Sequence, residues 1–219
     1  MTTGLRLDQL VCEVDGVPVD GGFCWYEVDL ARAAEAAPLG SDRLRTAPAP
    51  RVIAATRSHD EIEVRNGIAR LAGTGVTHVQ FEATGDERST RRVVADLANL
   101  GLAAVPAAHL DAPASVEQLV TWAGQLTQFG AAVVKIVYPV RCPTDLAPGL
   151  AALRLWSATE PPLSLTPSGS RQARLAAALA GSALVYVPLR AEPDRLPAAW
   201  WRELVDASDP LTQSPEELS

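Results

Sequence analysis

The chain has 219 residues and a formal net charge of −7, with 47% hydrophobic and 21% charged residues. This length suits one domain with a sizeable core, and the composition is that of a globular protein. The negative charge argues against nucleic acid or an anionic membrane as a partner, and no apolar run is long enough to span a bilayer.

The three cysteines, Cys12, Cys24 and Cys142, are odd in number and show no CxxC spacing. We interpret them as free thiols of a reducing cytoplasm, without a zinc site. The first ten residues contain no apolar core of the signal-peptide type. We therefore expect a cytoplasmic protein that binds no metal.

The first 50 residues predict an irregular beginning. Alternating residues and a DG pair within 1–22 indicate short strands, and 23–28 is a further strand candidate. A short helix capped by Asp29 follows, and the proline-rich segment 38–50 is typical of a loop.

From residue 51 onwards, apolar strand segments alternate with helical segments, several of which end at a glycine. The strands are predicted at 51–57, 77–83, 102–109, 131–138, 162–167 and 182–189. A final helix is predicted around 198–207, and 209–219 is predicted to be a loose polar tail. Repetition at intervals of about 25 residues predicts a parallel sheet with crossover helices.

Such a sheet is either a closed barrel or an open doubly wound sheet. Neither a GxGxxG nor a GxxxxGK[ST] segment occurs, and Arg57, Glu82 and His109 lie at or near the C-terminal ends of their strands. We therefore predict an α/β fold of the (β/α)8 TIM-barrel type as one domain over 1–208. A full barrel typically needs about 250 residues, so the atypical part at 1–50 must supply shortened or irregular units.

Lys135 is the only lysine in the chain, and it lies in the apolar run AAVVKIVY (131–138). A desolvated lysine loses its proton more easily than an arginine and can attack a carbonyl. One interpretation is therefore a Schiff-base lysine pointing into a barrel or cleft. The other is a strand-end lysine whose amine extends to solvent.

Four further side chains suit the same chemistry. His109 would shuttle protons, Glu61 would hold or tune the histidine, and Arg57 and Arg174 would bind an anion. Each also has an ordinary structural interpretation: a satisfied strand-end histidine, a surface Arg57–Glu61 ion pair, and an arginine on a solvated helix face.

Four segments together resemble the type I 3-dehydroquinate dehydratases, which are Schiff-base (β/α)8 enzymes of the shikimate pathway. The segments are TRSHDE (56–61), VPAAHLDAP (105–113), VVKIVYPVRCPTDL (133–146) and PLSLTPSGSRQARLAAALAGSALVYVPL (162–189). The resemblance implies that Lys135 forms the imine and that His109 is the catalytic histidine. It matches Arg57 and Glu61 to an R-x-x-x-E segment and Arg174 to the arginine that binds the substrate carboxylate.

The chain departs from that family at the residues that contact the substrate. The family's early Glu-x-Arg has no arginine in either VCEVD (11–15) or WYEVD (25–29). The closing-loop region RAEPDRLP (190–197) lacks the family's glutamine, and Ala173 replaces a serine. These departures predict a divergent member with an altered substrate.

We therefore predict a cofactor-free, homodimeric Schiff-base lyase that eliminates water from a carboxylated cyclic ketone. A class I aldolase or cyclase using the same lysine is one alternative, and an inactive barrel acting as a binding or scaffold protein is another. The predicted catalytic residues are Lys135, His109 and Glu61, and the predicted substrate-binding residues are Arg57, Arg174, Glu82 and Ser164.

Overall fold

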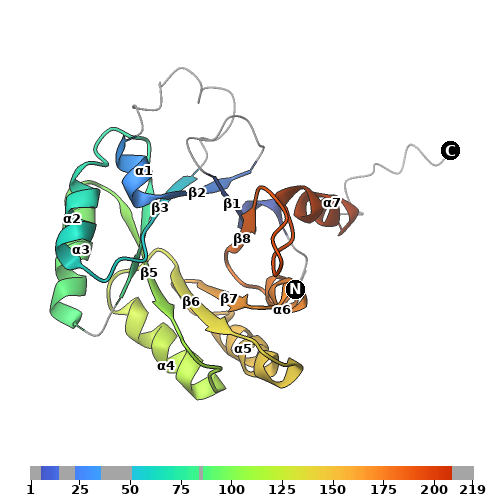
Figure 1. Ribbon diagram of the computed structural model, residues 1–219. Coiled ribbons are helices and arrows are strands. Elements are labelled where there is room, and N and C mark those ends of the chain that lie inside the picture. The colour runs from blue at the N-terminus through green and yellow to red at the C-terminus, as the bar shows by residue number, and fades with distance from the viewer. Residues whose placement is uncertain (1–5, 15–22, 36–50, 84–85, 209–219) are drawn as a thin grey trace.

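The computed structural model of the chain describes residues 6–14, 23–35, 51–83 and 86–208 (Figure 1). The segment at 38–50 that was predicted to be a loop, and the polar tail predicted at 209–219, lie outside these residues.

Eight parallel strands form one sheet that curves into a nearly closed barrel. They are β1 (Leu10–Glu13), β2 (Trp25–Asp29), β3 (Arg51–Ala55), β4 (His78–Glu82), β5 (Ala103–His109), β6 (Val134–Pro139), β7 (Leu163–Ser168) and β8 (Val185–Pro188). From β1 to β7 each strand pairs with the next one in sequence, and β8 returns to pair with β1. The predicted (β/α)8 barrel is confirmed.

The sheet has one seam, between β7 and β8, where no strand ladder is formed. Several hydrogen bonds bridge it near the start of these strands, two of them donated by backbone N–H groups. The backbone N–H of Ala183 donates to the carbonyl of Leu163 at 2.9 Å, and the N–H of Leu165 donates to the Ser182 hydroxyl at 3.0 Å. The lower part of the seam is therefore held by individual hydrogen bonds.

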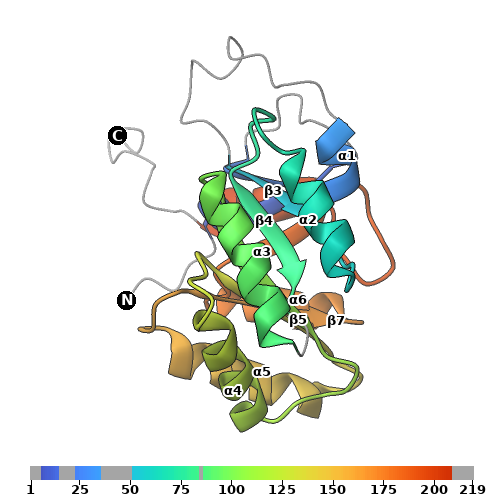
Figure 2. The ribbon, with the colours of Figure 1, turned by 90° about the vertical axis from the view of Figure 1, so that its left-hand side faces the viewer.

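Helices cover the outside of the barrel, with α2 and α3 side by side on the face that Figure 2 presents. After the short 3-10 turn η1 (Leu7–Gln9), they are α1 (Leu30–Glu35), α2 (Glu61–Ala69), α3 (Glu87–Asn99), α4 (Val116–Thr127), α5 (Pro143–Trp156), α6 (Arg171–Leu179) and α7 (Ala198–Ser208). Side chains of Asp60, Asp86, Ser115 and Ser170 accept hydrogen bonds from first-turn N–H groups of α2, α3, α4 and α6.

The first units are short, as predicted. The connection from β1 to β2 is shorter than any later connection between consecutive strands, and α1 has only six residues. Both strands nevertheless complete the sheet, because β1 pairs with β2 on one side and with β8 on the other.

The interior of the barrel changes from apolar to polar along the strands. Its lower layer is one buried cluster that includes Val11, Trp25 and Val133. Side chains two residues further along a strand lie on the same face of the sheet. At those positions Glu13, Glu27 and Lys135 replace apolar groups, so the polar layer lies towards the C-terminal ends of the strands.

Candidate active site

A cavity of about 660 Å³ opens at the C-terminal ends of the strands. Barrel enzymes carry their active sites on this face, and the volume is within the usual range for a small-molecule site. Of the predicted site residues, Lys135, His109, Arg57 and Arg174 line the cavity, whereas Glu61, Glu82 and Ser164 do not.

Lys135 is 5% exposed and extends from β6 into the cavity. Its Nζ donates a hydrogen bond to Oε1 of Gln80 at 2.7 Å and lies 3.4 Å from the centre of the Tyr186 ring. Burial lowers the pKa of this amine, and the Glu27 carboxylate, 3.8 Å away, raises it in part. The amine is buried inside the barrel, so the alternative in which it extends to solvent does not fit the structure.

His109 reaches the same cavity from the neighbouring strand. Lys135 pairs in register with Ala107, so His109 lies two residues further towards the end of β5 on the same face. Nδ1 of His109 is hydrogen-bonded to Oε1 of Glu82, whose side chain is 4% exposed. Because a carboxylate only accepts, Nδ1 carries the hydrogen and Nε2 keeps a lone pair that can take a proton.

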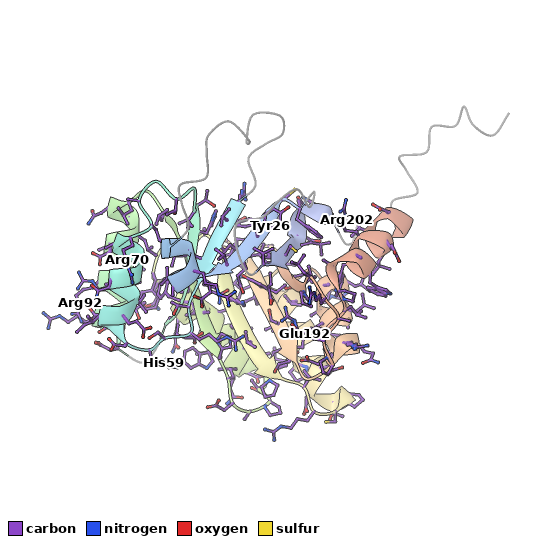
Figure 3. The ribbon with its side chains drawn as sticks, turned by 45° about the horizontal axis from the view of Figure 1, so that its top comes forward. Tyr26, His59, Arg70, Arg92, Glu192 and Arg202 are labelled. Carbon is purple, nitrogen blue, oxygen red and sulfur yellow. The ribbon has the colours of Figure 1, made fainter. Side chains whose placement is uncertain are left out.

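The expected contact between Glu61 and His109 is wrong. Glu61 begins α2 and forms ion pairs with Arg92 of α3 and Arg65 of its own helix. Figure 3 shows Arg92 at the periphery of the molecule. The hydrogen bond with Arg92, followed by one with Ser89, lowers the pKa of Glu61 to about 2. The carboxylate that orients the histidine is Glu82, which was expected to bind substrate.

Ser164, which was predicted to bind substrate, does not line the cavity. Its side chain is fully buried, and its hydroxyl donates a hydrogen bond to the carbonyl of Leu184 at 3.0 Å. It therefore ties β7 to the segment before β8, and it contributes to the seam and not to the cavity wall.

Two of the arginines that line the cavity have a buried Nε atom. Arg174 comes from α6, and Arg195 comes from the loop between β8 and α7. Arg195 forms ion pairs with Glu13 and Glu192, yet the Nε atoms of both arginines are buried without a hydrogen-bond partner among the described residues. Burial lowers the pKa of Arg174, and the nearby Arg195 charge lowers it further. An anion bound here would relieve both effects.

Several residues of the cavity were not assigned roles from the sequence. Gln80 accepts the hydrogen bond of Lys135, and Glu27 and Tyr186 surround the amine. Within the described residues, Oε2 of Glu27 and the Tyr186 hydroxyl are buried without hydrogen-bond partners. A usable signal existed for two of them, because Glu27 and Tyr186 each lie two positions after an apolar residue of the inward-facing cluster, Trp25 and Leu184.

No protein-family model matches the sequence, and no curated protein matches it. Solved structures do match. The type I 3-dehydroquinate dehydratase of Clostridium difficile, with covalent modified comenic acid, superimposes with a TM-score of 0.76 at 13% identity over 93% of each chain. The 3-dehydroquinate dehydratase of Geobacillus kaustophilus HTA426 gives 0.76 at 18% identity, covering 94% of this chain and 93% of that one.

The 3-dehydroquinate dehydratase of Enterococcus faecalis gives a TM-score of 0.71 at 14% identity, covering 94% of this chain and 97% of that one. The likeness is one of fold. It extends over 93–94% of this chain, and it agrees with the resemblance carried by the sequence segments.

Within the described residues, no helix is long and apolar enough to cross a membrane. The same part of the chain contains no group of three or more histidine, cysteine, aspartate or glutamate side chains arranged to hold a metal ion.

Proposed function

We propose that the chain is a Schiff-base-forming lyase, similar to the type I 3-dehydroquinate dehydratases, that eliminates water from a carboxylated ketone. The observation that carries the proposal is the placement of the only lysine. Lys135 is buried in the polar layer of the barrel, opens to the cavity, and lies one strand away from a histidine held by a carboxylate. A nucleophilic amine and an oriented base on one cavity are what imine-based elimination requires.

Each group has a step in this scheme. Lys135 attacks the ketone, water leaves, and the resulting iminium withdraws electrons from the adjacent carbon. His109 Nε2 removes a proton from that carbon and returns it to the departing hydroxyl group. Arg174, with Arg195 beside it, binds the substrate carboxylate through donors that are otherwise unpaired. The fold match to a dehydratase with covalent modified comenic acid supports covalent chemistry in such a barrel.

The test is reductive trapping of the full chain. Incubation with a carboxylated ketone, either 3-dehydroquinate or pyruvate, followed by borohydride should add the mass of the reduced adduct to one site. Peptide mapping should place that mass on Lys135, since no other lysine exists. No adduct with any carboxylated ketone would favour the inactive barrel, and a trapped adduct with carbon–carbon bond formation would favour an aldolase or cyclase.

We expect 3-dehydroquinate to be turned over poorly or not at all. In WYEVD (25–29) of β2, Glu27 matches the glutamate of the family's early Glu-x-Arg, but Asp29 stands where that motif has arginine, and the closing loop carries Arg195 and no glutamine. Two expected substrate contacts are therefore missing, and a carboxylate stands beside the reactive amine. A coupled absorbance assay for the dehydrated product measures this. Turnover as efficient as that of the family would show that these departures do not alter specificity.

A further inference from the structure

Glu27 is a carboxylate that the scheme above does not use. It extends from β2 into the cavity, in register with Glu13 of β1. Glu13 is held by Arg195, but Oε2 of Glu27 is buried without a hydrogen-bond partner among the described residues. That oxygen lies 3.8 Å from Nζ of Lys135. A buried carboxylate oxygen that faces the reactive amine without a hydrogen bond requires an explanation.

The surroundings of the pair favour the movement of a proton between the two groups. Burial lowers the pKa of Lys135 and raises the pKa of Glu27, so the enclosed site weakens the charged form of each. The other charges that act on Glu27 are those of Glu13, Arg195 and Arg57. Gln80 accepts one hydrogen of the amine and cannot take up its proton, whereas the Glu27 carboxylate, 3.8 Å from Nζ, can.

The scheme above already assigns His109 to the proton transfers of the elimination step. Its Nδ1 is bonded to Glu82 of β4, so its base is Nε2, which approaches the cavity from β5. Glu27 approaches from β2, on the other side of β3 and β4 in the strand order. The cavity therefore contains acid–base groups on separate strands, and imine-based elimination has two stages that each need proton transfer, imine formation and elimination.

We propose that Glu27 is the acid–base catalyst of imine formation, which leaves His109 to the elimination step. This rests on the proposed Schiff-base function. In the first step the carboxylate takes a proton from the Lys135 ammonium, and the free amine adds to the ketone carbon to give a carbinolamine. Glu27 then returns that proton to the carbinolamine oxygen as the carbon–oxygen bond breaks. Water leaves, the iminium keeps one positive charge, and the carboxylate is regenerated.

The test measures how fast the imine forms. Full chains of wild type and Glu27→Gln are mixed at pH 7 with 3-dehydroquinate or pyruvate, whichever gives more wild-type adduct. Samples are quenched with borohydride at timed intervals and quantified by intact mass. Glu27→Gln should slow the appearance of the adduct by about 10²-fold, a typical contribution of one acid–base group. Long incubation should still give the adduct, because Lys135 remains.

The direction in which Glu27→Gln changes the rate of adduct formation distinguishes acid–base catalysis by Glu27 from a purely electrostatic effect. If Glu27 acted only as a fixed charge that keeps Lys135 protonated, its removal would release more free amine, and trapping would become faster or stay unchanged. Either result would overturn the proposal. The matched control is Glu63→Gln, because Glu63 is an exposed carboxylate of α2 that lies outside the cavity. It should trap at the wild-type rate.

Glu27→Asp is the alternative variant if Glu27→Gln does not fold. It keeps the carboxyl group but moves it away from Nζ by the length of one methylene, so it should still slow trapping by about tenfold or more. An unchanged rate in that variant overturns the proposal. A wild-type chain that forms no adduct with either 3-dehydroquinate or pyruvate contradicts the lyase function itself, whereas wild-type trapping with equally fast Glu27→Gln trapping contradicts only the role of Glu27.

Discussion

Lys135→Ala should abolish borohydride-trapped mass and reduce turnover of any true substrate to less than about a thousandth of the wild-type value. The reason is that Lys135 carries the only side-chain amine, and every other basic side chain except histidine is an arginine, which does not form an imine. Intact-mass analysis after incubation with ketone and borohydride measures the first effect, and steady-state kinetics measures the second.

The fold should survive this change. Removing the ammonium leaves Glu27 without its nearest cation, but burial already raises the pKa of Glu27, so that carboxyl can take a proton instead. The thermal midpoint should therefore stay near that of wild type. Lys135→Arg is the matched control: it keeps a positive charge but cannot form an imine, and it should be equally inactive. Substantial turnover by either variant would show that catalysis is not covalent.

His109→Ala should separate the two halves of the reaction. Its imidazole serves proton transfer and not carbonyl attack, so the trapped adduct should persist while turnover falls by about 10²–10⁴-fold. Timed borohydride quenching measures the adduct, and product formation measures turnover. The variant should therefore form the imine with its ketone but carry out the elimination only slowly.

Glu82→Gln provides the comparison for His109. The amide keeps the shape of the side chain but loses the negative charge that holds Nδ1–H and supports an imidazolium. Turnover should fall less than in His109→Ala, again with the adduct retained. If His109→Ala eliminated the adduct as well as turnover, the histidine would belong to imine formation, and the division of labour with Glu27 would be wrong.

The sequence was most informative where a residue belongs to a strand. His109 and Lys135 lie in consecutive strands of a parallel barrel, and such strands are adjacent, so their common cavity follows from chain order. The barrel itself follows from the regular alternation of strands and helices after residue 50. The sequence predicted only that residues 1–50 contain shortened or irregular barrel units. Strands as short as β1 and β2 give too little periodicity to locate them individually.

The sequence was least informative where the direction of a side chain depends on packing. Glu61 follows its strand by only a few residues, but it begins a helix, and its direction is set by Arg92 on the next helix. Ser164 is next to Lys135 in register, yet its hydroxyl is used by the Leu184 carbonyl. The bond between Glu82 and His109 depends on the register of β4 against β5, which no local pattern specifies.

Because the only lysine is buried, cleavage by a lysine-specific protease can be used to measure how often the barrel opens. A protease specific for lysine has a single bond to cut, between Lys135 and Ile136, and both residues are buried in β6, which has a neighbouring strand on each side. Cleavage requires that strand to leave the sheet. When opening is fast relative to cutting, the rate at which two fragments appear measures the population of opened molecules, without a spectroscopic label or denaturant.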